Sequence, residues 1–131
     1  MPRTTADALV ERLIEGDVDT IFGIPGDAIN GFVDALRKTS DRIRFIHVRH
    51  EEVGALAAVS YAKFTGKLGV CFSTAGPGAA HLLNGLLDAK MDLVRLLAIT
   101  GMTYHDQIGT ENMQGTNSDY LLNPVTILMS G

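Results

Sequence analysis

Short apolar runs alternate with amphipathic segments along this chain, and this alternation limits the fold more than any other feature of the sequence. Strands are predicted at residues 20–23, 43–48, 69–72 and 96–100. Helices are predicted from Thr4 or Thr5 to Gly16, from Asp27 through Leu36, over residues 51–65 and over residues 79–90. Because the connections are short, consecutive strands are expected to be parallel and joined by right-handed crossovers. The predicted fold is therefore α/β, a doubly wound, mostly parallel sheet with helices on both faces.

Helical spacing also predicts which side chains of these helices pack against the sheet. They are Ile29, Phe32, Val33 and Leu36 in the second helix, Val53, Ala57, Tyr61 and Phe64 in the third, and Leu82, Leu83, Leu86 and Leu87 in the fourth. After residue 101 the periodicity fades, and residues 104–117 are predicted to form a polar loop. The edge of the sheet beside strand 96–100 is then expected to be exposed unless another segment covers it.

Composition narrows the functional classes open to the chain. With 131 residues, of which 46% are hydrophobic, residues 1–131 suit a single domain with one sizeable core. The formal net charge of −4 argues against a nucleic-acid partner. No stretch resembles a membrane span or a signal peptide, so a cytoplasmic protein without a membrane partner is predicted. The single cysteine, Cys71, lies in an apolar run and is predicted to be a buried core residue.

Chemistry is expected where three of the predicted strands end. Glu51 stands on the first turn of a helix directly after the apolar run 43–48, and glycine-proline turns at 23–26 and 76–78 follow two other strands. The carboxyl ends of neighbouring parallel strands line one crevice, so these three segments are predicted to converge. A partly buried carboxylate that faces such a crevice suits proton transfer. Taken singly, an acidic first turn or a glycine-proline turn is an ordinary structural feature.

Several other kinds of site do not fit the spacing. The glycine turns lack the pattern of a dinucleotide fingerprint, and no lysine follows them as a phosphate-binding loop requires. His105 stands between Tyr104 and Asp106, but no nucleophile elbow accompanies this triplet. The four histidines, at positions 47, 50, 81 and 105, show no metal-ligand spacing, so no metal site is predicted.

Several spaced motifs become recognisable together, in one register from about Thr4 to Gln114. They resemble the N-terminal pyrimidine-binding domain of thiamine diphosphate-dependent enzymes of the acetolactate synthase and pyruvate oxidase group. The motifs are Gly23-Ile24-Pro25-Gly26-Asp27, Val48-Arg49-His50-Glu51-Glu52, residues 61–70, Ala75-Gly76-Pro77-Gly78, His81, residues 84–86 and residues 88–89.

The resemblance implies roles for individual residues. Glu51 matches the family glutamate that hydrogen-bonds the pyrimidine ring nitrogen of thiamine diphosphate and so promotes proton removal from the cofactor. Gln114 matches a glutamine that reaches toward the substrate, a 2-oxo acid. The residues implied to bind the cofactor are Pro25, Gly26, Glu51, Pro77, Gly78 and His81.

The sequence also departs from the family pattern. Met113 and Gly115 flank Gln114 where the family prefers Phe and Glu, and Arg95 stands where a proline normally opens the strand. The family segment from Gly-Asp-Gly to Asn-Asn, which holds Mg²⁺ and the diphosphate, is not found, nor are the central domain and the last strand and helix of the pyrimidine domain. The domain is therefore expected to be C-terminally incomplete, with Mg²⁺ held by a domain outside this chain.

The expected partner is a second copy of the chain or a chain carrying the diphosphate-binding domain. We expect this chain alone not to turn over substrate, but to act as part of an enzyme that decarboxylates or ligates pyruvate-like 2-oxo acids. FAD, if the parent enzyme uses it, would sit on the central domain. Two alternatives stay open: the small subunit of a split 2-oxo acid decarboxylase, and a catalytically idle remnant domain. The residues do not distinguish oxidation, carboligation and decarboxylation.

Overall fold

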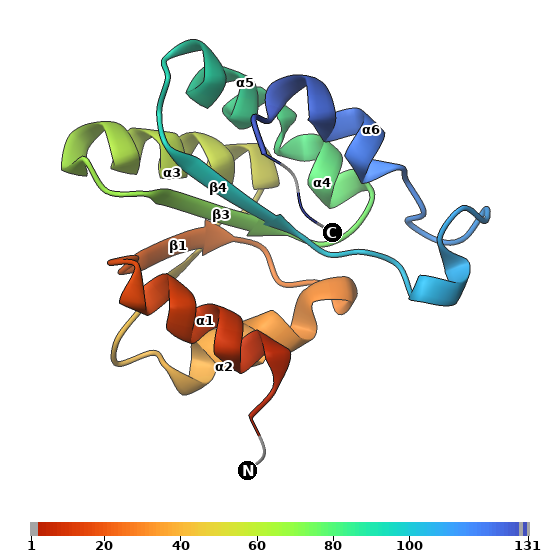
Figure 1. The fold of residues 1–131 in the computed structure, drawn as a ribbon, viewed down its shortest axis with the longest axis horizontal. Coiled ribbons are helices and arrows are strands. Elements are labelled where there is room, and N and C mark those ends of the chain that lie inside the picture. Colours follow the sequence, from red (N-terminus) through yellow and green to blue (C-terminus); the bar gives the residue numbers. More distant parts are fainter. Residues whose placement is uncertain (1–2, 129, 131) are drawn as a thin grey trace.

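The computed structural model describes residues 3–128 and 130, which form a four-stranded, all-parallel sheet covered by helices (Figure 1). The strands are β1 (Thr20–Gly23), β2 (Arg44–His47), β3 (Gly69–Ser73) and β4 (Leu96–Thr100). Their order across the sheet is β2-β1-β3-β4. The chain therefore leaves β1 for β2 on one side and returns to pair β3 on the other side of β1. This reversal confirms the doubly wound α/β fold, and in open parallel sheets such a switch point, here the carboxyl end of β1, is where the ligand crevice is expected.

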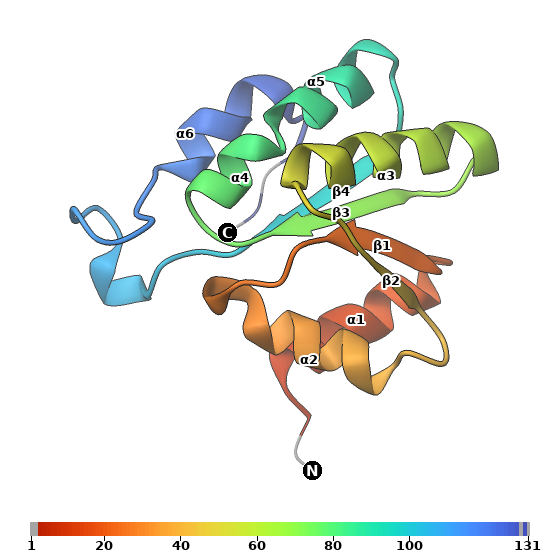
Figure 2. The same cartoon turned by 180° about the vertical axis from the view of Figure 1, so that it is seen from behind.

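Helices cover both faces of the sheet (Figures 1 and 2). One face carries α1 (Thr5–Glu15) and α2 (Asn30–Lys38), and the other carries α3 (Glu51–Thr65), α4 (Pro77–His81) and α5 (Leu83–Met91). A short sixth helix, α6 (Ser118–Leu122), packs beside α4. The described residues also include three single turns of 3₁₀ helix: Asp27–Ile29, His105–Gln107 and Asn123–Val125.

Local sequence signals explain where several helices begin and end. Thr4 caps α1, because its side chain accepts a hydrogen bond from the Asp7 backbone N–H at 3.0 Å and the Asp7 carboxylate accepts one from the Thr4 N–H at 2.8 Å. Gly16 follows α1 as predicted. Gly66 ends α3 in the left-handed conformation, with φ of 73°.

The core under α1 and α2 agrees with the predicted pattern. Ile29, Phe32 and Leu36 are buried, and the Phe32 ring meets the fully buried Phe72 of β3 edge-on at 5.4 Å between centroids. Cys71 is also fully buried, which confirms its predicted core role, and burial raises the pKa of its thiol to about 12.

The predicted inward face of α3 was wrong for two of its four residues, whereas Ala57 and Tyr61 are half-buried. Val53 and Phe64 are exposed, by 54% and 92%, and small residues face the sheet and α5 instead. A β-carbon built at Gly85 of α5 would lie only 2.3 Å from the Ala55 β-carbon. The two helices are therefore in backbone contact, which larger inward side chains would prevent. The buried residues of α3 are Gly54, Ala55, Ala58, Val59 and Ala62.

Two other helix predictions need correction. Asp27 begins a 3₁₀ turn rather than capping α2, whose N-cap position is Ile29. The helix predicted over residues 79–90 is two helices, because the chain tightens at Leu82, whose N–H bonds the Ala79 carbonyl three residues back at 3.2 Å. The tighter turn places Leu82 fully in the core, whereas Leu87 is 45% exposed.

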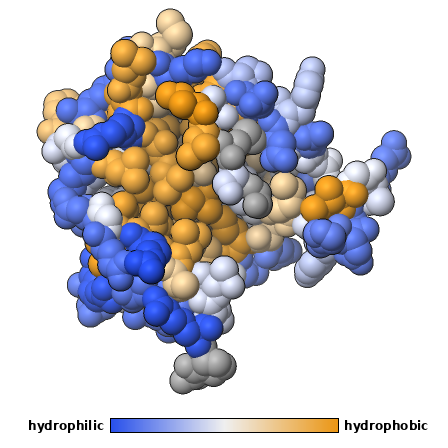
Figure 3. Space-filling view, viewed as in Figure 1, coloured by the Kyte–Doolittle hydropathy of each residue, from blue (hydrophilic) through white to orange (hydrophobic). Residues whose placement is uncertain are grey.

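Both edges of the sheet differ in burial from its centre. The apolar run before Glu51 forms the predicted strand, β2, which is an edge strand whose end residues, Arg44 and His47, are exposed. β4 forms the other edge and is half-buried throughout. Figure 3 shows hydrophobic residues gathered along the course of β4 on this face. At its entrance Arg95 reaches solvent and donates to the Gly66 carbonyl at 2.8 Å, which avoids burying a charge.

Within residues 3–128 and 130, none of the helices has the length and apolar character needed to cross a membrane.

Candidate functional site

Three loops meet at the carboxyl end of β1, where the chain changes direction across the sheet. They follow β1, β2 and β3, and they carry the two glycine-proline turns and Glu51. A β-carbon built at Gly78 would lie 3.4 Å from Glu51 Oε1, and one built at Gly26 would lie 2.5 Å from the Thr74 β-carbon. The structure therefore brings together the three segments that the sequence indicated.

Glu51 is fixed at this crevice by the start of α3. His50 is the N-cap of the helix, and its Nδ1 accepts a hydrogen bond from the Glu52 backbone N–H at 3.3 Å. The Glu51 side chain is 14% exposed, and its Oε2 lies 2.9 Å from His81 Nδ1. Glu51 is thus mostly enclosed yet hydrogen-bonded to a group that can carry a proton.

His81 comes from the last residue of α4, on the other side of β1 from β2. Its side chain is 48% exposed, and its ring stacks on that of His50 with 4.5 Å between centroids and 28° between planes. Sequence reasoning chose His81 but not His50. The available signal for His50 was its place directly before the candidate glutamate, at the N-cap.

Two glycines and a threonine form a cradle beside the carboxylate. Gly26 and Gly78 both pack on Thr74, which leaves no room for side chains of their own. Among the buried side-chain oxygens of the described residues, Thr74 Oγ1 and Asn112 Oδ1 have no hydrogen-bond partner. A free hydroxyl, a carboxylate and two bare glycines within one crevice fit a flat ring with polar edges. Sequence reasoning missed Thr74, although it directly precedes the Ala75–Gly78 motif.

The two prolines lie on the rim of the crevice. Pro25 and Pro77 are exposed, and Pro77 occupies the first position of α4, where its missing N–H costs no helical hydrogen bond. Gly76, just before it, has a φ of 60° that favours glycine. These residues shape the turns that hold Gly26 and Gly78 in place.

Gln114 lies against the second turn through its backbone. A β-carbon built at Gly76 would lie 2.4 Å from the Gln114 carbonyl oxygen, and Gln114 itself has a φ of 60°. The Gln114 residue and its neighbour Met113 are exposed. The structure therefore brings the Gln114 backbone to the second turn, but within the described residues the Gln114 side chain makes no hydrogen bond to Glu51.

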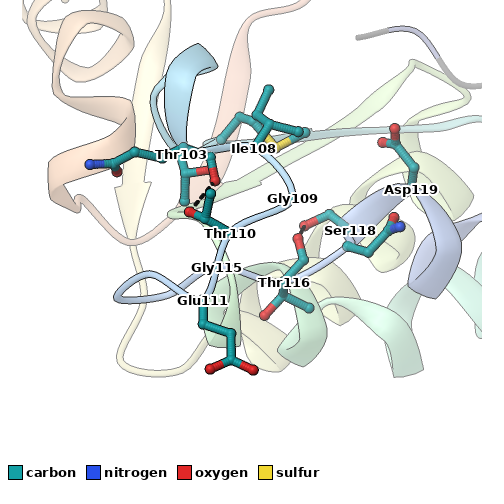
Figure 4. Close-up of a pocket in the computed structure, with 12 residues that line it drawn as sticks. Thr103, Ile108, Gly109, Thr110, Glu111, Gly115, Thr116, Ser118 and Asp119 are labelled. Atoms are coloured by element: carbon teal, nitrogen blue, oxygen red, sulfur yellow. Dashed lines mark hydrogen bonds between the residues drawn. The ribbon is translucent and has the colours of Figure 1, made fainter.

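A separate hollow of about 380 Å³ lies in the long loop after β4 (Figure 4). All its lining residues fall between Met102 and Asp119. The hydroxyl of one of them, Thr110, donates a hydrogen bond to the Gln107 carbonyl at 2.8 Å. Because Glu51 and the glycine turns do not line it, this hollow is distinct from the crevice. The crevice, in contrast, holds the enclosed Glu51 carboxylate, the His81 imidazole and the unpartnered Thr74 hydroxyl, so we take it as the candidate site.

Comparisons with known proteins agree on one family. Residues 3–121 match the family described as thiamine pyrophosphate enzyme, N-terminal TPP binding domain. The chain is 53% identical over 109 residues to a pyruvate oxidase of Lactiplantibacillus plantarum, which covers 82% of this chain and 17% of that protein. It is 46% identical over 114 residues to the acetolactate synthase large subunit of Parasynechococcus marenigrum, with 86% and 18% covered.

A third relative is an acetolactate synthase of Mycobacterium leprae, 43% identical over 123 residues, with 94% of this chain and 20% of that protein covered. The chain thus spans about a fifth of the length of these relatives.

Proposed function

This chain belongs to the thiamine pyrophosphate enzyme family, and from that premise we propose that it supplies the half of the cofactor site that binds the aminopyrimidine ring. The observation that carries the proposal is the placement of Glu51. Its carboxylate lies, mostly enclosed, 2.9 Å from His81 and against the bare face of Gly78, at the switch point of the sheet.

Each residue of the crevice has a distinct task in this proposal. Glu51 exchanges a proton with the ring nitrogen: its carboxyl group donates to the neutral nitrogen, and its carboxylate accepts from the protonated ring. Gly26 and Gly78 let Thr74 pack closely against both turns, and the unpartnered Thr74 hydroxyl offers a hydrogen bond to a polar edge of the ring. When bound, thiamine diphosphate supplies an electron sink for bond cleavage beside a carbonyl.

The finer parts of the proposal concern the whole protein. Relatives named pyruvate oxidase and acetolactate synthase support a parent enzyme that acts on pyruvate-like 2-oxo acids. We place Mg²⁺, the diphosphate and any FAD on domains outside these residues, contributed by another copy or another chain. Gln114, at the second turn, is proposed to face the substrate.

A ligand fragment tests the pyrimidine half directly. The fragment 4-amino-5-hydroxymethyl-2-methylpyrimidine contains the ring without the thiazolium or the diphosphate. Titrated into the ¹⁵N-labelled chain, it should shift the amide signals of Gly26, Glu51 and Gly78, with a dissociation constant of about a millimolar, as expected for so few atoms.

Glu51→Gln should weaken this binding at least about tenfold, because the amide keeps the shape of the side chain but can neither give a proton to the ring nitrogen nor balance the charge of the protonated ring. Glu52→Gln is the matched control on the same turn and should leave binding unchanged. Equal losses from both substitutions, or no shifts with the wild-type chain, would refute the assignment of Glu51.

Thiamine and thiamine diphosphate should bind this chain with similar weak affinity. The diphosphate ordinarily gains its affinity from charge-assisted contacts and a metal ion, which we place on another domain. Calorimetry with magnesium present measures both. Low-micromolar binding of thiamine diphosphate alone would show that the diphosphate site lies in these residues.

A further inference from the structure

Two histidines and one carboxylate meet at the amino end of α3. His50 and Glu51 are consecutive at the start of α3. His50 is the N-cap, with an extended backbone at φ of −152° and ψ of 139°, and Glu51 is the first helical residue. His81 approaches from the end of α4, so the three side chains come from junctions on either side of β1. One potential ligand atom of each lies within 4.8 Å of the other two.

We propose that this cluster binds a transition-metal cation of the zinc class, with His50, Glu51 and His81 as its three protein ligands. Zinc takes imidazole nitrogens and carboxylate oxygens at about 2.0–2.2 Å, which puts neighbouring ligand atoms about 3.3 Å apart. The 2.9 Å between His81 Nδ1 and Glu51 Oε2 is already at that scale. Side-chain rotations that move the third ligand atom by up to about 1.5 Å bring it to the same separation.

The lone pairs and the charge of the cluster suit this ion. In the metal-free chain His50 Nδ1 accepts the Glu52 N–H at 3.3 Å, so the ring proton is on Nε2 and the free lone pair is on Nδ1; the ion would take this Nδ1 lone pair in place of the weak cap bond. Glu51 supplies the negative charge that offsets the positive end of the α3 dipole. Three protein ligands leave a coordination position for water, and the exposure of His50 and His81 lets the ion enter.

Magnesium does not fit the same cluster. It prefers six oxygen ligands, and two of the three ligands here are nitrogen. The site is therefore different in kind from a magnesium-diphosphate site. It also uses Glu51, so an ion bound here excludes the aminopyrimidine ring; this last consequence rests on the proposed function.

Titration calorimetry with zinc chloride tests the site on the whole chain, purified without a histidine tag. One zinc ion should bind per chain, and magnesium chloride should give no comparable heat. His50→Asn and His81→Asn should each weaken zinc binding at least about tenfold, since even outer-shell losses cost about that much. Asn at position 50 retains the ability to cap α3. His47→Asn and His105→Asn are matched controls and should leave the affinity unchanged.

A second measurement uses the wild-type chain and depends on no variant folding. Substoichiometric Cu²⁺ should broaden the amide signals of His50, Glu51 and His81 before those of His47 and His105. Earlier broadening at His47 or His105, or equal zinc affinity in all four histidine variants, would overturn the site.

The competition arm separates this inference from the proposed function. Zinc at saturation should abolish the shifts caused by the aminopyrimidine fragment. Fragment binding that persists unchanged with zinc bound would overturn the mutual exclusion, whereas a fragment that never binds would count against the proposed function and leave the zinc titration to decide the metal site.

Discussion

Gly85→Ala should destabilise the chain, although alanine is the better helix former. In a helix interior the substitution gains about 0.8–1.0 kcal/mol in propensity. Here, however, the new β-carbon would lie 2.3 Å from the Ala55 β-carbon and 3.0 Å from the Leu56 backbone nitrogen, against about 3.5–4.0 Å for an ordinary carbon contact. Backbone on the far side cannot rotate away, so α3 and α5 must separate.

Overpacking of this kind typically costs about 1–3 kcal/mol, and a contact more than an ångström too short belongs at the upper end. After subtracting the propensity gain, we expect a net loss of about 1–2 kcal/mol in the free energy of unfolding. Urea denaturation followed by circular dichroism measures it, as a lower midpoint with an unchanged slope.

Gly31→Ala is the matched control. Gly31 also lies in a helix, but a β-carbon there would meet only the Ala6 β-carbon at 3.9 Å. This variant should be as stable as the wild type or more stable by up to about 1 kcal/mol. A Gly85→Ala chain that gains stability as Gly31→Ala does would refute the close approach of α3 to α5.

Three further predictions follow from other parts of the fold. Hydrogen bonds from Lys67 and Tyr61 lower the pKa of Asp19 from 3.8 to about 2, so their stabilisation is present above pH about 4 and is lost as the pH falls toward 2. Between pH 6 and pH 3, Asp19→Asn should therefore lose less of its free energy of unfolding, measured in urea, than the wild type loses. An equal loss in both chains would contradict this. Cys71 should react with a thiol reagent only at the rate of unfolding, because it is fully buried and its pKa is about 12; rapid labelling in native buffer would contradict its burial. The chain should self-associate as its concentration rises, because β4 presents an unpaired edge among hydrophobic residues; sedimentation velocity that shows only monomer at every concentration would count against this.

Local chemistry made much of the fold predictable. Helix limits came out right where a cap marks them, as at Thr4, Gly16 and Gly66, and β4 came out right because its apolar run is bounded. The inward face of α3 did not, because ranking by hydrophobicity favours Val53 and Phe64 and overlooks small residues that permit close helix contact. Helix propensity and hydrophobic pattern describe one segment at a time, whereas the contact between α3 and α5 depends on the sequences of both helices.

The site was predictable in part for a related reason. Glu51 and the glycine turns stand at strand ends, and the parallel rule alone brings such ends to one edge. The meeting of His50 with His81 depends on the strand order, which places β2 and β3 on opposite sides of β1. Ligand spacing along the chain cannot reveal that order, and the position of Thr74 beneath both glycines is likewise set by packing between loops.

The backbone contact between α3 and α5 has a consequence for how this domain can vary. The position of Glu51 is set by Gly54, Ala55 and Gly85, whose side chains have no rotamers to change. The opposite face of α3, with Val53 and Phe64, takes no part in that contact. Substitutions on the outer face can therefore accumulate, and new binding partners can come to dock there. The position of the Glu51 carboxylate would not change, because the backbone contact between α3 and α5 fixes it.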